Sequence, residues 1–534
     1  MKRGFTLIEL LAVIVILAII ALIAVPIVIN IIEDAKKSSQ EESLRQYGKA
    51  VENGVANYLL NHPNDKDITL DKIESYIKYS GDPIECKTVQ INEKGKIYLA
   101  NCSINNTKVE YTYGEKQRDP NITVDLPQGL TPVIYDEANE KWIVVDKNDT
   151  KWYDYDEQKW ANAVVLGTDV TKQVGDEVKV DGSEAKMMLV YIPRYEYKIE
   201  GQYGKHLDGT EGTQSLPGEI EVNFIGKNIT TPTEGYHIHP AFTFDGEKGG
   251  FWVGKFEISS VGTNLTSSNN LGCSTTSCTN AQYLRILPNK PSLRYNNVSN
   301  FWYGIKSIEK TSSFGLSNID IHMMKNSEWG AVAYLSQSKY GKYGNNDYEG
   351  AQKEVYQNKD TGYVTGKSNG TPSQSTSYTQ CSYNQKKGTD TNQDQNNCGP
   401  GASTTGNIYG VYDMSGGAYE YVMGAYGTST PTIKSSGFGS TVFTGNMIES
   451  KYYDIYKTNN VSTACDNNGP CLGHAMSETA SWYGDYASMV SSSSPWFVRG
   501  GNSNYTTTAG VFYRSYDDGN SYNSYSARVV GFVK

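Results

Sequence analysis

An apolar run at the start of the chain is the strongest pattern in the sequence. From Phe5 to Ile32 the only charged residue is Glu9, and the run is long enough to cross a bilayer as a helix. Lys2 and Arg3 precede it, and basic residues favour the cytoplasmic side of a membrane. This pattern predicts that the chain after about Ile32 is extracytoplasmic. A carboxylate inside such a helix costs roughly 2.5–3.5 kcal/mol, so Glu9 is a candidate functional residue.

Helical spacing continues beyond the apolar run. Apolar residues recur at this spacing as Leu44, Tyr47, Val51, Val55, Tyr58 and Leu59. Pro63 ends the pattern, because the residue before a proline is pushed out of the helical conformation. We therefore expect one helix over 5–61, with its second half packed on a small head.

After this helix the pattern changes to short strand-like runs, so the predicted fold class is α+β. We expect a small head over 62–117, with a short helix near 70–78 and strands at 86–92, 96–102 and 108–113. Residues 118–130 read as a linker, and 131–534 form a large domain of short strands and loops. Its clearest helix is Asn326–Leu335, with Asn326 as the expected cap, and 340–406 are expected to be inserted loops. Trp142, Trp152, Tyr153, Tyr155 and Trp160 either start a new core or line the junction between the domains.

Length, charge and composition narrow the class of protein. At 534 residues the chain is too long for one domain. A net charge of −10 argues against a nucleic-acid partner, which selects basic patches. The chain has 41 tyrosines but 13 phenylalanines, and tyrosine suits exposed recognition surfaces because its flat ring ends in a polar group.

The eight cysteines form four near-neighbour pairs, an even count that predicts disulfides in an extracytoplasmic protein. A zinc site is the alternative, although the pairs lack further cysteine or histidine ligands at a matching spacing. The expected disulfide pairs are Cys86/Cys102, Cys273/Cys278, Cys381/Cys398 and Cys465/Cys471.

The N-terminal segment resembles that of type IV prepilins and pseudopilins. The matching residues are the Gly4-Phe5 junction, Glu9 and the helix-kinking Pro26. The resemblance implies that prepilin peptidase removes a leader, residues 1–4, and that Phe5 is N-methylated. It also implies that Glu9 pairs with the Phe5 amine of a neighbouring pilin subunit during assembly in the membrane. An ordinary N-terminal membrane anchor is the alternative.

Four segments of the large domain resemble the formylglycine-generating-enzyme branch of the C-type-lectin fold. They are 187–193, 250–258, 326–333 and, most specifically, 407–421, where Tyr419 and Tyr421 replace the usual tryptophans. Within the last segment we expect Asp413 and Glu420 to have roles internal to the fold. The sulfatase-activating members use cysteines in the C-terminal region, and this chain has no cysteine after Cys471. We therefore expect no enzymatic activity.

No cofactor is predicted. His237 and His239 lie two residues apart and could hold a metal, but a third ligand is not evident. His474 reads as a buried structural histidine rather than a catalytic one. Structural Ca²⁺ occurs in this fold, and the sequence does not locate a site for it.

The end of the chain has a restricted repertoire. Between residues 502 and 526, 19 of 25 positions are Asn, Ser, Thr, Tyr or Asp, and Lys, Glu, Gln, Met and Trp do not occur. Tyrosine with small polar residues is the repertoire of antibody paratopes. The pattern is similar to the C-terminal variable region of diversity-generating retroelement variable proteins, whose adenine-directed mutagenesis yields these residue types. A low-complexity polar tail is the alternative.

This resemblance assigns a variable region to 499–534. We expect its tyrosines to be exposed on one face, over buried Val511 and Phe512. The candidate ligand-binding residues are Asn502, Asn504, Tyr505, Tyr513, Ser515, Tyr516, Asp517, Asp518, Asn520, Tyr522, Asn523 and Tyr525.

Taken together, the sequence predicts a pilin-like protein at the cell surface or on a pilus, with a single membrane pass before assembly. Its C-type-lectin-fold domain would serve adhesion or recognition by binding a protein or glycan. Two alternatives stay open. One is a minor pseudopilin of a secretion or competence filament with a structural C-terminal domain, and the other is an extracellular enzyme with an unrecognised site.

Overall fold

The chain forms two compact units, Met1–Arg118 and Asp119–Lys534. The computed structural model describes residues 7–63, 65, 68–92, 95–109, 111–114, 119–261, 270–274, 278–368, 380–385, 399–465, 471–505 and 508–534, and of residues 7–31 and 34 the backbone alone. The predicted roles of Gly4, Phe5, Glu9 and Pro26 therefore lie outside the described side chains.

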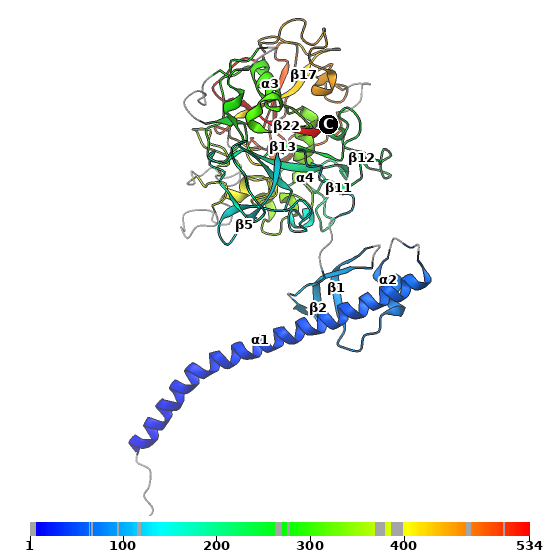
Figure 1. The fold of residues 1–534 in the computed structure, drawn as a ribbon, viewed down its shortest axis with the longest axis vertical. Helices are drawn as coiled ribbons and strands as arrows, with labels where there is room; N and C mark the ends of the chain where they lie inside the picture. Colours follow the sequence, from blue (N-terminus) through cyan, green and yellow to red (C-terminus); the bar gives the residue numbers. More distant parts are fainter. Residues whose placement is uncertain are drawn as a thin grey trace, which may run out of the picture. The chain divides into compact units, whose positions relative to one another are not determined.

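A single long helix dominates the first unit. Helix α1 runs from Leu7 to Asn61 and ends where the sequence predicts (Figure 1). Among the residues described with their side chains, we find no helix with the length and apolarity that a membrane span requires. The predicted span, Phe5–Ile32, lies almost wholly outside those residues.

The C-terminal half of α1 packs on a small antiparallel sheet. Leu44, Val51 and Val55 are fully buried against sheet residues such as Leu99. These three helix residues belong to the predicted apolar side of the helix. Cys86 and Cys102 face each other in neighbouring strands and form the predicted disulfide. The elements after α1 are α2 (Leu70–Ile73), η1 (Glu74–Tyr76), β1 (Ile84–Ile91), β2 (Ile97–Ile104), β3 (Thr107–Val109) and β4 (Tyr113–Gly114).

The second unit is built on an eight-stranded antiparallel sheet, in the order β16-β22-β13-β9-β7-β5-β6-β8. The last strand of the chain, β22, pairs with both β13 and β16, so the C-terminus is fixed inside the sheet. The strands are β5 (Leu130–Asp136), β6 (Lys141–Val144), β7 (Asn162–Leu166), β8 (Glu177–Val178), β9 (Ala185–Pro193), β13 (Gly250–Gly254), β16 (Ile319–Met323) and β22 (Val529–Val533). The two predicted strands, 187–193 and 250–258, correspond to β9 and β13.

A five-stranded sheet carries the C-terminal segment of interest. Its order is β18-β17-β19-β20, and β21 also pairs with β17. The strands are β17 (Tyr419–Tyr426), β18 (Asp454–Tyr456), β19 (Trp496–Arg499), β20 (Arg514–Asp517) and β21 (Tyr525–Ala527). Two smaller sheets contain β10 (Tyr195–Lys198), β11 (Glu221–Phe224) and β12 (His237–Ile238), and β14 (Ser259–Ser260) with β15 (Leu284–Arg285).

Helices are few and short in this unit. Helix α3 (Val298–Lys306) was not predicted, although Asn297 caps it by accepting from the Asn300 N–H. Helix α4 (Asn326–Ser336) was predicted, but its cap was assigned to the wrong residue. Lys325 occupies the cap position, because Asn326 already lies in the helix and donates its side-chain amide to the Tyr456 hydroxyl at 2.7 Å. Glu328, in the first turn of the helix, accepts from the Lys325 N–H at 2.7 Å.

Short 3₁₀ turns connect the remaining elements. They are η2 (Tyr155–Glu157), η3 (Pro240–Phe242), η4 (Ala281–Tyr283), η5 (Ser307–Lys310), η6 (Ser312–Phe314), η7 (Lys342–Gly344), η8 (Gly350–Lys353), η9 (Gly399–Ala402), η10 (Ser450–Tyr452) and η12 (Trp482–Gly484).

One large core fills the second unit. The aromatic residues between Trp142 and Trp160 belong to it, so they start a new core, which was one of the two predicted alternatives. Residues at the predicted linker also pack here, since the carbonyl of Asp125 accepts from the Trp252 indole at 2.8 Å. The predicted insert contributes as well, because Lys342 is fully buried and donates to the carbonyls of Glu354 and Gly401.

Candidate functional site

The segment 502–526 forms the connections around β20 in the five-stranded sheet. β19 leads into it and pairs with β20, with Phe497 opposite Tyr516. β21 then pairs with β17, with Tyr525 opposite Tyr419. Both ends of the segment are therefore held by strands of one sheet, which positions the loops between them.

Glycines make the turn just before this segment and one turn within it. Gly501 and Gly519 have φ of +73° and +93°, a region that favours glycine. A Cβ at Gly519 would lie 2.7 Å from the Trp496 ring, and one at Gly501 would lie 2.7 Å from Ala509 Cβ. These positions are fixed by close packing as well as by conformation.

Val511 and Phe512 form the predicted scaffold beneath the loops. They are 2% and 1% exposed. The Val511 carbonyl accepts from the Trp329 indole at 2.7 Å, and the Phe512 N–H donates to Asp485 at 3.0 Å. These contacts hold the middle of the segment on α4 and on the loop that precedes β19.

Three of the five predicted tyrosines are exposed. Tyr505, Tyr516 and Tyr522 are 39%, 43% and 37% exposed, and Tyr525 is half-buried. Tyr513 is only 1% exposed, so its expected exposure is wrong. Its ring lies 5.9 Å from that of Tyr419, 5.8 Å from Tyr505 and 5.8 Å from Tyr486, which places it beneath its neighbours.

The polar candidates also divide by exposure. Asn504, Asn520 and Asn523 are exposed, whereas Ser515, Asp517 and Asp518 are half-buried. Asn502 is buried, with its carbonyl accepting from the Gln357 side chain at 3.1 Å, so a ligand cannot contact its side chain freely.

Asp517 has a structural role in this sheet. Its two carboxylate oxygens accept from the hydroxyls of Tyr421, at 2.6 Å, and Tyr525, at 2.9 Å. Burial raises the pKa of Asp517 above its ordinary value. The carboxylate therefore ties β20 to β17 and β21 rather than pointing freely toward a ligand.

The tyrosines do not all share one face, contrary to the prediction. Side chains alternate along a strand, so Tyr516 and Asp517 lie on opposite faces of β20. Asp517 faces Tyr421 and Tyr525, and Tyr516 points away from them.

Two exposed tyrosines outside the segment were missed from the sequence. Tyr486 is 45% exposed and contacts the Tyr513 ring, and Tyr295 is 38% exposed with its N–H donating to the Tyr522 carbonyl at 2.9 Å. Neither lies in a recognisable sequence pattern. We define the tyrosine surface as Tyr295, Tyr486, Tyr505, Tyr522 and Tyr525.

Both carboxylates of the 407–421 segment make contacts within the fold. Asp413 accepts from the Gly366 N–H at 2.9 Å and from the Asn358 side chain at 2.9 Å. Glu420 is fully buried and accepts from Arg528 Nε at 2.9 Å. Burial raises the pKa of Glu420 to about 7, although Arg528 acts in the opposite direction. The Glu420–Arg528 pair joins β17 to the residue between β21 and β22, and the Asp413 contacts hold the segment before β17 on Asn358 and Gly366.

The structure does not gather a metal site around the candidate histidines. His237 is exposed, and His239 is fully buried with Nδ1 accepting from the Ala241 N–H at 3.3 Å. Within the described ranges, no three His, Cys, Asp or Glu side chains are grouped as metal ligands.

Three predicted disulfides lie within the described residues, namely Cys86–Cys102, Cys273–Cys278 and Cys465–Cys471. The fourth involves Cys398, which lies outside them.

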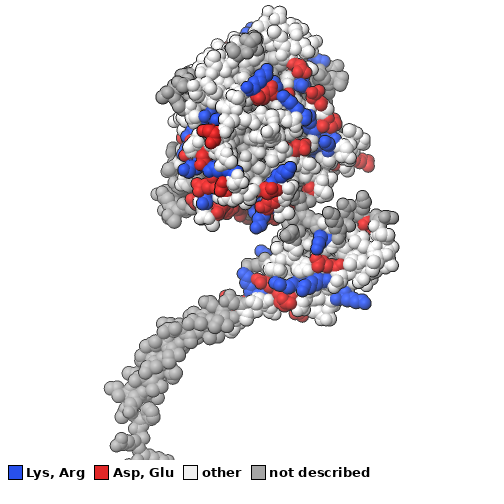
Figure 2. All heavy atoms as spheres, viewed as in Figure 1, with Lys and Arg blue, Asp and Glu red and all other residues white. Residues whose placement is uncertain are grey.

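Figure 2 shows basic and acidic side chains interspersed over the visible face of the second unit.

The first residues of the chain match a known family of N-terminal motifs. Residues 1–25 match the family model of the prokaryotic N-terminal methylation motif. This match confirms the predicted prepilin-type segment. No curated protein matches the sequence.

Among solved structures, the chain is similar to Treponema denticola variable protein 1, with 11% identity and a TM-score of 0.25, over 67% of this chain and 98% of that one. It is also similar to the M1 variant of the major tropism determinant, with 10% identity and a TM-score of 0.25, over 85% and 96% of the two chains. The U1 variant gives 11% identity and a TM-score of 0.22, over 75% and 95%. The first of these is a variable protein by name.

Proposed function

We propose that this chain is a pilin-like surface protein whose large unit binds a ligand through the tyrosine surface. This proposal rests on the positions of the exposed tyrosines. Of the five most exposed tyrosines of the described chain, at 37–45%, four belong to the tyrosine surface, namely Tyr295, Tyr486, Tyr505 and Tyr522, and the fifth is Tyr516. Three belong to the segment 502–526, and the other two contact residues of that segment.

The physical chemistry of this surface suits recognition. Tyrosine offers a large contact area with few rotatable bonds and a terminal hydroxyl, and exposed Asn504, Asn520 and Asn523 add adaptable hydrogen bonds. The buried Val511, Phe512 and Tyr513 beneath them keep the surface in place. Such a division allows the exposed residues to change while the fold is kept.

The location that we propose is extracytoplasmic. The N-terminal methylation motif is that of proteins processed by prepilin peptidase and assembled with other pilin subunits. Disulfides persist in oxidising compartments outside the cytoplasm. The ligand in this proposal is a protein or glycan on another cell or a phage, and a retroelement diversifies the exposed positions.

A display library of the full chain tests whether this surface binds. Positions 504, 505, 520, 522 and 523 are varied among Asn, Ser, Thr, Tyr and Asp, and the library is selected for binding to lysozyme as a model protein. A control library varies five exposed positions outside the tyrosine surface, namely 207, 208, 210, 211 and 215. We expect folded binders from the first library alone. Loss of folding in most members, or equal recovery of binders from both libraries, would contradict the proposal.

A further inference from the structure

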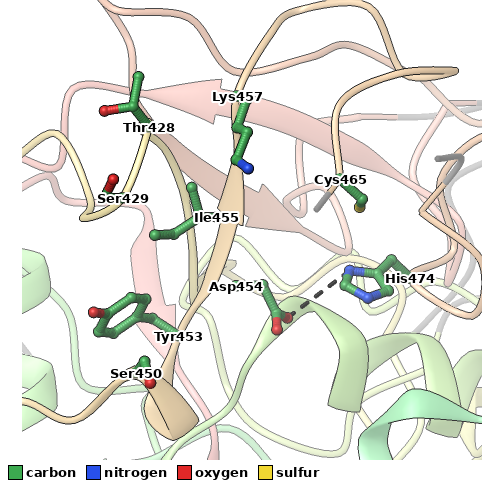
Figure 3. Close-up of a pocket in the computed structure, with 9 residues that line it drawn as sticks. All are labelled: Thr428, Ser429, Ser450, Tyr453, Asp454, Ile455, Lys457, Cys465 and His474. Atoms are coloured by element: carbon green, nitrogen blue, oxygen red, sulfur yellow. Dashed lines mark ion pairs between the residues drawn. The ribbon is translucent and has the colours of Figure 1, made fainter. Parts of the chain in front are cut away.

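A cavity lies at the opposite edge of the five-stranded sheet from β20. It has a volume of about 540 Å³, within the range of small-molecule sites. Strand β18, the turn after β17 and the loop that contains His474 form its walls (Figure 3). The lining residues are Thr428, Ser429, Ser450, Tyr453, Asp454, Ile455, Lys457, Cys465 and His474, none of which belongs to 502–526.

A hydrogen-bond chain holds the ring of His474 in place. The Asn326 side-chain amide donates to the Tyr456 hydroxyl oxygen at 2.7 Å. The Tyr456 hydroxyl in turn forms a hydrogen bond with His474 Nδ1, 2.7 Å away. Burial lowers the pKa of His474, so its ring is neutral near pH 7. The other ring nitrogen, Nε2, then offers one hydrogen-bond donor or one acceptor, according to the tautomer.

Asp454 supplies an acceptor beside this histidine. Its Oδ2 accepts from the Ser327 N–H at 2.7 Å and lies 3.9 Å from His474 Nδ1. Its Oδ1 has no hydrogen bond to any residue that the structure describes. Figure 3 shows the carboxylate and the imidazole pointing toward each other at the cavity. An imidazole and a carboxylate therefore line the same cavity.

We infer that this cavity binds a neutral, hydroxyl-rich ligand of the size of a disaccharide. A sugar hydroxyl both donates and accepts, so it can donate to the carboxylate and can bond either tautomer of the imidazole. Seven of the nine lining residues have polar side chains, a wall that is too polar for a hydrocarbon ligand. The wall has one acidic and one basic side chain, Asp454 and Lys457. It therefore lacks the excess of positive charge that a phosphate would require and the excess of negative charge that a polycation would require. The ring of Tyr453 and the side chain of Ile455 offer apolar contact to a sugar face.

Saturation-transfer NMR on the full-length protein in detergent micelles tests this inference. The probes are maltose, lactose, mannobiose and N,N′-diacetylchitobiose, with hexanoic acid as the non-sugar control. We expect transfer to at least one disaccharide and none to hexanoic acid. Asp454→Asn keeps the shape of the side chain but removes its charge, and should weaken that disaccharide at least tenfold.

Two further variants keep the test decisive if Asp454→Asn does not fold. Thr428→Val and Lys457→Gln change exposed side chains at the rim, and each should weaken the same disaccharide. A Tyr505→Ala, Tyr522→Ala double variant changes only the tyrosine surface and should leave disaccharide binding unchanged. The inference is overturned if no disaccharide receives saturation, or if the rim variants bind as the unmodified protein does. Because the two surfaces share no residue, this result is independent of the proposed function.

Discussion

At the scale of single residues, the tyrosines of the C-terminal segment have different roles. Tyr505 and Tyr522 are exposed, so replacing either by alanine should change the free energy of unfolding by less than about 0.5 kcal/mol. Tyr513→Ala should cost about 3 kcal/mol or more, because it empties a space among Tyr419, Tyr486 and Tyr505. Denaturant unfolding of the full-length variants measures both. Equal losses for the two classes would show that Tyr505 and Tyr522 are core residues.

His322 gives the large unit a pH-dependent contribution to stability. Burial alone would lower its pKa, but the carboxylates of Glu328, 3.1 Å from Nε2, and Asp320 outweigh burial and raise it. Because the pKa of His322 is raised in the folded state, its protonation contributes its full stabilisation below pH 6.5, the ordinary pKa. This stabilisation is lost as the pH rises through the pKa of the folded state.

His322→Gln should therefore cost more stability at pH 6 than at pH 9, about 3 kcal/mol at the lower pH. Val164→Ala is the control, because it removes a fully buried apolar side chain on β7 and changes no titratable group. Its cost should be the same at both pH values. A His322→Gln cost that does not depend on pH would contradict the assignment.

At the scale of elements, the turn between β20 and β21 depends on Gly519. Gly519→Ala should be destabilising for two reasons, a φ of +93° and a Cβ only 2.7 Å from the Trp496 ring. Gly209→Ala has a similar φ of +84° with no atom within 4 Å of the new Cβ. The difference between the two losses in unfolding free energy isolates the packing term, which we expect to be about 1–3 kcal/mol. Equal losses would mean that the turn moves freely away from Trp496.

Elements with a strong local pattern were predictable from sequence. The end of α1 at Asn61 follows from the periodicity and Pro63, and strands β9 and β13 follow from their apolar runs. Helix α3 was missed because it has only nine residues and its cap, Asn297, sits in a stretch that reads as a turn.

The candidate site was predictable only in part. The burial of Val511 and Phe512 follows from their apolar side chains between polar neighbours. The burial of Tyr513 depends on Tyr419 and Tyr486, which are distant in the sequence and meet only in the folded sheet. The same holds for Tyr295, which reaches the surface through its contact with Tyr522. Long-range packing of this kind leaves no local pattern.

At the scale of the whole molecule, processing should begin the mature chain at Phe5. The N-terminal methylation motif covers residues 1–25, and cleavage after Gly4 would keep the apolar segment. Intact-mass measurement of the protein from its native membrane should give a chain that starts at Phe5 with one added methyl group. A mature start after about residue 30 would contradict the pilin-like assignment.

Assembly should depend on Glu9. Glu9→Ala should leave membrane insertion intact, because a costly carboxylate is removed from an apolar segment. Incorporation into a filament should fall, because the Phe5 amine loses its partner. Membrane fractionation and immunoelectron microscopy measure the two effects separately, and normal incorporation would show that the pairing is not needed.

Diversification of the tyrosine surface is tested most directly by deep sequencing of the gene in a natural population of the source organism. If the tyrosine surface is a diversified binding surface, substitutions should concentrate at adenines in the codons of exposed positions such as 504, 505, 520, 522 and 523. The codons of Val511, Phe512 and Gly519 should stay unchanged, because those residues hold the scaffold. A template copy of this region should lie beside a reverse transcriptase gene. Variation in 502–526 that is no greater than in 131–498, or that falls equally on scaffold and exposed codons, would contradict the claim.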